Sequence, residues 1–225
     1  MKLLCIDTSS NTESIALTSD QDTVASTSAY RKKGHSSDLL KDIQEVMNSV
    51  NWTWDDLDGF GIGLGPGGFT SLRIGLATAK TLAHSLRKPL FGVSTLNIVN
   101  AAFSEPHCIP LIDAKRNEVY VDIPSLGLKC LPPSMLPEHF SREAPHFFCG
   151  DGAIRYADEL ISAFPHARIN QDLDTNVPDA RYIARLINPS QPDAIATLQP
   201  FYVRPSDAEL TYPDGFPDAV VQFKL

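Results

Sequence analysis

The stretch GLGPGGFTSLRIGLATAKTLA, residues 63–83, joins a loop rich in glycine directly to an alanine-rich run with helical character. A glycine loop at the start of a helix can cradle a phosphate. Glycine also lets two backbone segments approach closely. The loop is not a Walker A motif, because Phe69, Thr70 and Ser71 stand where that motif has a lysine beside its hydroxyl residue. Residue types alone therefore favour close packing, with Thr70 as the N-cap of the helix.

The segments around this loop predict a mixed sheet with helices on its faces. Just before the loop, GFGIGLG alternates apolar residues with glycines, which is typical of a strand with one bare face against which something packs closely. Further upstream, three β-rich segments over residues 2–30 predict a meander, and residues 36–50 have the spacing of an amphipathic helix capped by Ser36 or Ser37. Downstream, a helix over residues 70–86 precedes a buried strand, PLFGVS, and a short helix.

The second half of the chain repeats this alternation less regularly. HCIPLIDA, NEVYVDIP and FFCGDGA are predicted strands, whereas AIRYADELISAF and DARYIARLIN are predicted helices. The proline-rich residues 125–146 are expected to be irregular. We place a domain boundary near residues 103–107.

Composition excludes several classes of function. The chain has 225 residues, 43% of them hydrophobic, and a net charge of −8, which predicts a globular protein that is repelled by nucleic-acid backbones. Its four cysteines form no CxxC pair, so reduced thiols are expected. No two of its six histidines stand four residues apart and no GxSxG elbow is present, so we expect neither a metal nor a hydrolase nucleophile. No segment approaches the ~20 apolar residues of a membrane span, and we expect a soluble, cytoplasmic protein.

A ridge of small residues runs along the helix that follows the loop. Ser71, Gly75, Ala79 and Ala83 recur every four residues, and leucines flank them. Such a ridge lets another element pack unusually close. It serves either the core of the chain or an interface between subunits, and the sequence does not choose between them.

Taken together, the motifs resemble the TsaB (YeaZ) family of tRNA threonylcarbamoyladenosine biosynthesis proteins, nearly from end to end. GPGGFTSLRIG is similar to the family's GPGSFTGLRIG, with Gly68 where serine is usual and Ser71 where glycine is usual. The other matching segments, in the expected order, are LLCIDTSS, His35-Ser36 followed by Leu39-Leu40, GVSTL, IDAKRNEVY, CGDGA and PFYVR.

The resemblance implies the two-lobed α/β fold of actin, sugar kinases and Hsp70-type ATPases, which is ribonuclease H-like, with mixed sheets. The first lobe is then expected over residues 1–104, joined by the C-terminal segment 197–225, and a smaller second lobe over residues 105–196.

The resemblance also implies a non-catalytic subunit. The family is paralogous to TsaD, a transferase that modifies ANN-decoding tRNAs. It pairs with TsaD, or with a second copy of itself when alone, and a TsaE-type ATPase joins the pair. The tRNA is bound only through that complex. In this chain the implied interface residues are Leu40, Ile43, Met47, Ser71, Leu72, Gly75, Leu76, Ala79, Ala83 and Leu86.

Nucleotide binding is expected to be weak, and no cofactor is expected. An ATPase of this fold needs a second glycine-rich turn in its second lobe, and residues 113–117 read DAKRN instead. A remnant anion site would comprise Asp7, Thr8, Ser9, Gly65, Gly67, Thr70 and Arg73. Two alternative functions remain at this point. One is an ATP-dependent phosphotransferase of the same fold. The other is a glycoprotease, although the sequence contains no recognisable pair of nucleophile and base to support it.

Overall fold

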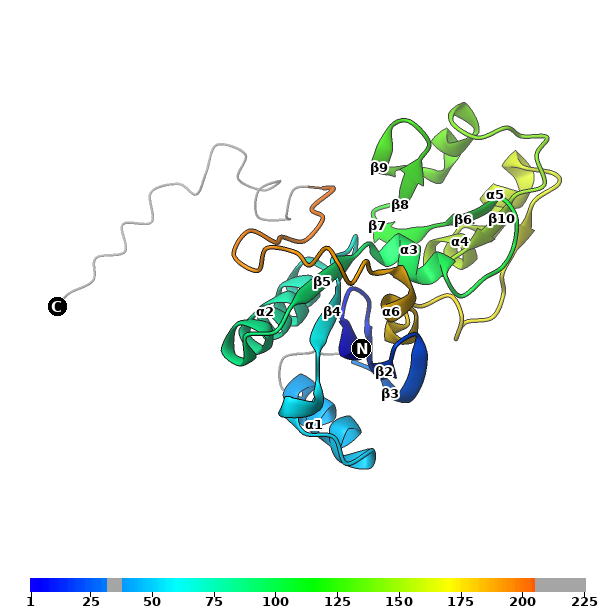
Figure 1. Cartoon of the computed structure of the whole chain (residues 1–225). Helices are drawn as coiled ribbons and strands as arrows, with labels where there is room; N and C mark the ends of the chain where they lie inside the picture. The colour runs from blue at the N-terminus through cyan, green and yellow to red at the C-terminus, as the bar shows by residue number, and fades with distance from the viewer. Residues whose placement is uncertain (32–37, 205–225) are drawn as a thin grey trace, which may run out of the picture.

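The computed structural model describes residues 1–31 and 38–204, which form two α/β lobes (Figure 1). The first lobe contains a five-stranded sheet in the order β3-β2-β1-β4-β5. Its strands are β1 (Lys2–Asp7), β2 (Thr12–Ser19), β3 (Asp22–Tyr30), β4 (Gly59–Gly63) and β5 (Leu90–Val93). The first three form an antiparallel meander, and β4 and β5 continue parallel to β1, so the predicted mixed sheet is confirmed.

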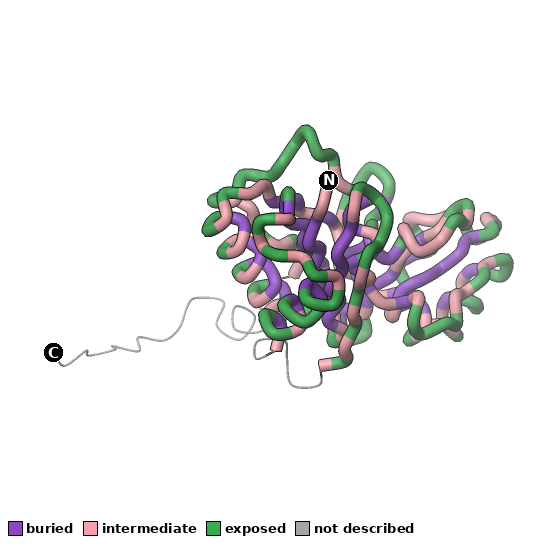
Figure 2. Tube along the Cα trace, turned by 60° about the horizontal axis from the view of Figure 1, so that its bottom comes forward, coloured by how far each residue is buried: buried purple, intermediate pink, exposed green. Residues whose placement is uncertain are grey.

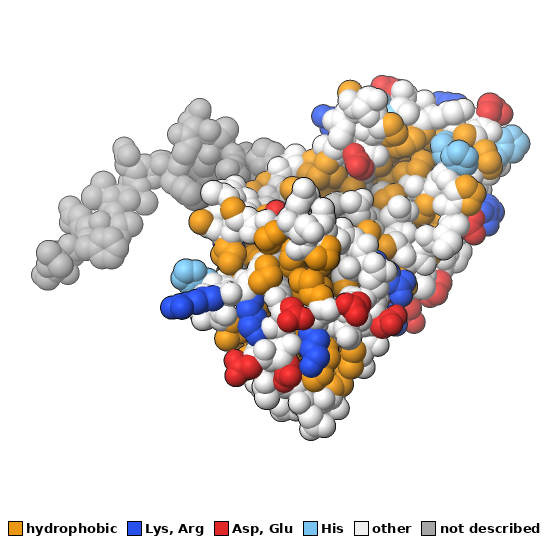
Figure 3. Space-filling model, viewed as in Figure 1, with side chains coloured by type: hydrophobic (Ala, Val, Ile, Leu, Met, Phe, Trp, Pro, Cys, Tyr) orange, Lys and Arg blue, Asp and Glu red, His pale blue; other side chains and the backbone are white. Residues whose placement is uncertain are grey.

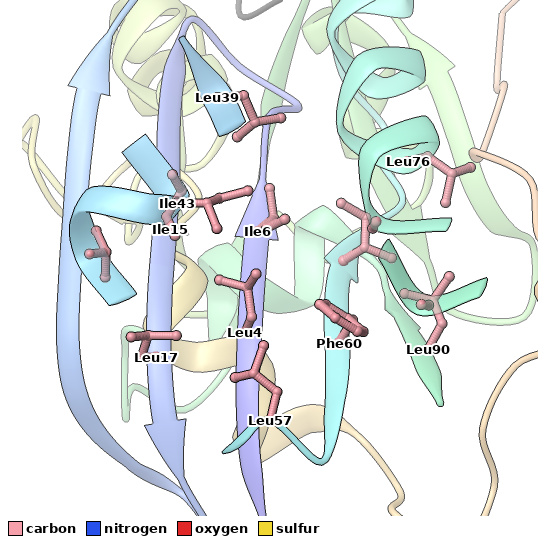
Figure 4. Packing of buried hydrophobic residues seen from close by; sticks show 14 of the residues in the cluster. Leu4, Ile6, Ile15, Leu17, Leu39, Ile43, Leu57, Phe60, Leu76 and Leu90 are labelled. Atoms are coloured by element: carbon pink, nitrogen blue, oxygen red, sulfur yellow. The ribbon is translucent and has the colours of Figure 1, made fainter. Parts of the chain in front are cut away.

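Helices cover both faces of this sheet. On one face lie α1 (Leu39–Ser49) and α2 (Phe69–Leu86). Figure 4 shows Leu39 and Ile43 of α1 and Leu76 of α2 pointing onto the sheet. The other face is covered by α3 (Thr95–Asn100), η3 (Ala180–Tyr182) and α6 (Ile183–Leu186), and a short turn, η1 (Trp54–Asp56), precedes β4.

The second lobe contains two smaller sheets. The parallel strands β6 (Cys108–Pro110), β10 (Phe147–Cys149) and β11 (Arg168–Ile169) form one of them. The antiparallel strands β7 (Ile112–Lys115), β8 (Glu118–Ile123) and β9 (Gly127–Leu131) form the other. The lobe also contains η2 (Pro133–Glu138), α4 (Asp151–Arg155) and α5 (Ala157–Ala163). Its side chains form a core of their own, and Figure 2 shows buried residues running through both lobes.

Two local predictions were wrong. Residues 125–146 are not wholly irregular, because Gly127–Leu131 pairs with β8 and extends its hairpin before the prolines begin. Helix α2 begins at Phe69 with Gly68 as its N-cap, so Thr70 lies inside the helix. The N-cap predicted for α1, Ser36 or Ser37, and the His35-Ser36 motif lie outside the described residues.

The chain returns to the first lobe before residue 196. Ala180, Ile183 and Ala184 pack against side chains of β1 and β5, although they fall within the segment expected to form the second lobe. Beyond them, Asp193 accepts a hydrogen bond from the Gly92 N–H (2.7 Å), and the Phe201 N–H donates to the Leu64 carbonyl (2.8 Å). Among the described residues, no helix has the length and hydrophobicity needed to span a bilayer.

Candidate functional site

The glycine loop is locked against the Thr8-Ser9 turn that follows β1. A Cβ atom on Gly67 would collide with the Ser9 carbonyl, and one on Gly75 would collide with the Thr8 hydroxyl. A Cβ atom on Gly63, at the end of β4, would collide with the Asp7 carboxylate. Gly67 is thus required where two backbone segments approach closely, and Gly63 and Gly75 leave room for the side chains of Asp7 and Thr8. Packing accounts for the loop's composition.

Four hydrogen-bond donors at and beside this turn are used inside the protein. The Ser9 N–H and hydroxyl both donate to Asp7 Oδ1, at 2.9 and 2.6 Å. The Gly68 N–H donates to the Ser9 carbonyl (2.7 Å), and the Thr8 hydroxyl donates to the Ser71 carbonyl (2.8 Å). Because these donors are engaged, they are not aimed at an anion.

Thr95, at the first position of α3, completes this arrangement. Its hydroxyl accepts from the Gly65 N–H (3.1 Å) and donates to Asp7 Oδ2 (3.4 Å), while its own N–H donates to the Gly65 carbonyl (2.8 Å). Thr95 is completely buried. Thr95 is not among the predicted site residues, although GVSTL, the motif that contains it, places a hydroxyl residue where a strand gives way to a helix.

A cavity of about 230 Å³ lies between the lobes. The first lobe contributes to its wall the turn 9–11, the end of the glycine loop (67–68) and Phe69, Ser71 and Leu72 of α2. The second lobe contributes residues 112–115 with Asp151 and Asn176, and residues 201–204 close one side. Of the predicted anion-site residues, Ser9 and Gly67 line this cavity. Asp7, Thr8 and Gly65 are buried beneath it, and Thr70 is exposed on α2.

The predicted role of Arg73 in holding an anion does not match its position. Its guanidinium lies 3.9 Å from the centre of the Phe69 ring, and its Nε donates to the Tyr202 hydroxyl at 2.9 Å. Phe69 and Tyr202 also contact each other, with ring centres 5.0 Å apart. Arg73 is therefore engaged by Phe69 and Tyr202, which line the cavity although Arg73 does not, because the first turn of α2 directs it toward the C-terminal segment.

The second-lobe wall of the cavity carries charges that neutralise one another. Lys115 Nζ lies 2.5 Å from Asp113 Oδ2, and Arg155 lies 3.6 Å from the same oxygen. The turn that follows has three residues with positive φ, Lys115 (60°), Arg116 (52°) and Asn117 (63°), none of them glycine. This turn carries bulky side chains in place of the glycines that a backbone cradle for phosphate would use.

Asp151 lies in the same wall and accepts a hydrogen bond from the Asp113 N–H (2.9 Å). Burial raises the pKa of the Asp151 carboxyl, the nearby Asp113 charge adds to this effect, and the hydrogen bond from the Asp113 N–H opposes it. In the described part of the chain, no three His, Cys, Asp or Glu side chains are grouped so that they could hold a metal ion.

The small-residue ridge of α2 faces the sheet, which corrects the predicted interface. Ala79 and Ala83 are completely buried, and Gly75 touches Thr8. Other predicted interface residues are buried in the chain itself, namely Ile43, Met47, Leu72 and Leu76. Leu40 is exposed (59%), and Ser71 and Leu86 are half-buried. The ridge thus belongs to the core of the chain and not to an interface between subunits: it lets α2 pack closely against β4 and the Thr8-Ser9 turn.

A different stripe of α2 points outward. We call it the outer face of α2, and it consists of Thr70, Ile74, Ala77, Thr81 and Ser85. These residues are spaced by three and four, and all are exposed except Ile74, which is half-buried. They are small or uncharged, so this face also permits close approach by another helix. The spacing is visible in the sequence, but burial was needed to tell this stripe from the ridge.

The mixed sheet of the first lobe, the second α/β lobe and the cavity between them define a two-lobed α/β fold. A family model described as "TsaD: tRNA N6-adenosine threonylcarbamoyltransferase" matches residues 23–123, slightly less than half of the chain. The chain is also similar to the tRNA threonylcarbamoyladenosine biosynthesis protein TsaB of Bacillus subtilis, at 35% identity over 55% of each chain. The TsaB of Escherichia coli is 32% identical over 53% of each chain.

Two solved structures from Pseudomonas aeruginosa share this fold. One, described as similar to peptidase YEAZ, has a TM-score of 0.74 at 25% identity and covers 90% of this chain and 99% of its own. The other, YeaZ, has a TM-score of 0.65 at 24% identity, covering 83% and 90%. These comparisons show that the chain is similar to TsaB (YeaZ) proteins. The chain spans about half the length of the curated relatives it matches.

Proposed function

We propose that the chain is a non-catalytic subunit in the synthesis of threonylcarbamoyladenosine on tRNA. It pairs with a TsaD-type transferase, and the pair recruits a TsaE-type ATPase. The pathway is suggested by the names of the relatives. One observation supports the non-catalytic role. We call it the interlock: Ser9 donates to Asp7 and Gly68 donates to Ser9, so that donors which could bind a phosphate make internal hydrogen bonds instead.

We assign partner binding to the outer face of α2, together with the exposed Leu40 of α1. Both helices rest on the same hydrophobic core, so they cover the same face of the first-lobe sheet. The outer face of α2 has no charged side chain, and a partner helix could pack against it without burying an unpaired charge. In the absence of the transferase, the same face would pair with a second copy of the chain.

Substitutions at Ala77, in the middle of the outer face, test this assignment. Ala77→Arg places a long charged side chain in the proposed contact, while Ala77→Ser keeps a small one and serves as the matched control. Sedimentation velocity with a TsaD-type transferase should show association for wild type and Ala77→Ser, and a loss of at least about tenfold in affinity for Ala77→Arg. Normal association of Ala77→Arg would place the interface elsewhere. No association of the wild-type chain would overturn the proposed function.

Binding of tRNA is assigned to the partner. The chain has a net charge of −8, which opposes contact with phosphates. On the face of the molecule shown in Figure 3, basic and acidic side chains are interspersed, and no basic stripe appears there.

A further inference from the structure

We propose that Cys108 and Cys149 form a redox-active pair in the second lobe, which a hydroperoxide converts reversibly into a disulfide. Cys108 is the first residue of β6 and Cys149 is the last residue of β10. The two strands pair in parallel, and the Sγ atoms lie 3.4 Å apart. Neither cysteine belongs to the proposed partner surface.

The register of the strands brings the two thiols to one side of the sheet. Cys108 is aligned with Phe147, and Cys149 is aligned with Pro110, so the cysteines lie diagonally across the pair. Residues two apart on a strand share a face, which places both side chains on the same side. Closing the bond requires the sulfurs to move from 3.4 Å to about 2.05 Å. Both residues stand at strand ends, where strand pairing holds the backbone on one side only, so the two cysteines can move together.

The two thiols differ in pKa and in exposure. The difference suits Cys108 to attack the hydroperoxide and Cys149 to form the disulfide afterwards. A hydrogen bond from the Cys149 thiol lowers the pKa of Cys108, and burial and the Glu105 carboxylate oppose this shift. The same hydrogen bond, together with burial, raises the pKa of Cys149. Cys108 is half-buried and Cys149 is completely buried, so an oxidant reaches Cys108 first. Thiolate character and access together favour Cys108 as the attacking residue.

The remaining cysteines are poor competitors. Burial raises the pKa of Cys5 to about 12. Burial and the nearby Glu118 carboxylate raise the pKa of Cys130 to about 11. Oxidation at low doses of hydroperoxide is therefore expected at the pair alone.

The proposed step balances in two parts. The Cys108 thiolate attacks one oxygen of the hydroperoxide, the O–O bond breaks, and the leaving oxygen takes a proton and departs as water or an alcohol. The resulting sulfenic acid is attacked by the Cys149 sulfur, whose proton leaves with the hydroxyl as water. Two thiols lose two electrons in total and the hydroperoxide gains them. A dithiol reductant reverses the reaction by exchange.

The crosslink would stiffen the wall of the interlobe cavity. The Cys149 carbonyl accepts a hydrogen bond from the Leu111 N–H (2.8 Å), and the next residue, Gly150, donates to Asn176 (2.6 Å). Asn176 and Asp151 line the cavity. A disulfide across a sequence separation of 41 residues also restricts the unfolded chain. Oxidation should therefore raise the midpoint of thermal unfolding.

The test treats the full chain with stoichiometric hydrogen peroxide and counts thiols after denaturation. The count should fall from four to two, and the intact mass should decrease by two hydrogen atoms. Peptide mapping without reduction should recover a single link between Cys108 and Cys149, and a dithiol should restore all four thiols. Four surviving thiols, or a link that involves Cys5, Cys130 or a second molecule, would overturn the proposal.

Variants assign the two roles. Cys149→Ser should leave Cys108 as a sulfenic acid that a dimedone-type reagent traps, whereas Cys108→Ser should show no trapping and no loss of thiols. Cys130→Ser is the matched control and should form the link as wild type does. Trapping at Cys149 in the Cys108→Ser chain would reverse the roles. The mapping of the wild-type chain decides the proposal even if a variant fails to fold.

Discussion

Gly67 and Gly68 are neighbours in sequence, but the space around them differs sharply. A Cβ atom on Gly67 would meet the backbone of Ser9, whereas a Cβ atom on Gly68 would have no neighbour closer than 3.4 Å. A side chain therefore fits at position 68, so the glycine of this chain and the serine of the TsaB motif are both compatible with the loop. At position 67 it does not, because the loop must lie against the Thr8-Ser9 turn.

The pair provides a matched test of the packing explanation. Gly67→Ala should lower the free energy of unfolding by about 1–3 kcal/mol, since backbone atoms must shift to admit the methyl group. Gly68→Ala should change it by no more than about 0.5 kcal/mol. Urea unfolding followed by circular dichroism measures both. Equal effects at the two positions would argue against the interlock as the reason for the glycines.

Asp151 gives the stability of the protein a defined dependence on pH. The pKa of its carboxyl is raised in the folded state from the ordinary value of 3.8, so the folded protein holds the proton more tightly than the unfolded chain. Stability therefore falls as pH rises from that value through the folded pKa. Asp151→Asn keeps an oxygen for the Asp113 N–H and removes the buried charge.

The variant should unfold at a higher temperature than wild type at about pH 7, and the difference should vanish near pH 3, where both side chains are neutral. Differential scanning calorimetry at the two pH values gives the comparison. A variant that is less stable than wild type at neutral pH would show that the Asp151 charge stabilises the wall.

Helix α2 shows what a sequence pattern can and cannot decide at the scale of an element. Its end at Leu86, its glycine loop and the strand before it are predictable from composition and spacing, because turn residues and apolar periodicity act locally, whereas its N-cap is Gly68 and not the predicted Thr70. The direction of the small-residue ridge is not predictable in this way. Ala79 and Ala77 are the same residue type two positions apart, and the sheet beneath the helix buries one and leaves the other exposed. The strand β9 was missed although its partner β8 ends only a short turn upstream, because the prolines from Pro132 onward dominate the composition of residues 125–146.

Ala79→Arg and Ala77→Arg test the orientation of α2. Arginine at position 79 would bury a charge against Phe60 and Leu76 in the first-lobe core and should cost on the order of 3–5 kcal/mol, enough to unfold much of the protein. Arginine at position 77 should leave the melting curve near that of wild type, because the position is exposed. Thermal melts followed by circular dichroism separate the outcomes. A stably folded Ala79→Arg variant would show that the ridge does not face the core.

At the scale of the whole molecule, two lobes enclose a cavity beside which the Ser9 and Gly68 N–H groups, both candidates for phosphate binding, are engaged within the protein. Isothermal calorimetry with Mg²⁺ and ATP should detect no binding at low micromolar concentrations, since the Ser9 and Gly68 N–H groups are already engaged. Binding in that range would favour the phosphotransferase alternative.

The distribution of charge leads to a second expectation for the isolated chain. With a net charge of −8, it should not shift tRNA in a gel at submicromolar concentration and roughly physiological salt, where electrostatic attraction is heavily screened. Addition of the transferase should produce the shift. A shift by the chain alone would show that it holds RNA directly.

The central claim is that this chain activates a transferase through contact and contributes no chemistry of its own. The most direct measurement is threonylcarbamoyl transfer to an ANN-decoding tRNA in a reconstituted system with a TsaD-type transferase and a TsaE-type ATPase, to which wild type, Ala77→Ser or Ala77→Arg is added. We predict that transfer requires the chain, that Ala77→Ser supports it fully, and that folded Ala77→Arg supports less than about a tenth of it at equal concentration. Full transfer without the chain would contradict the claim.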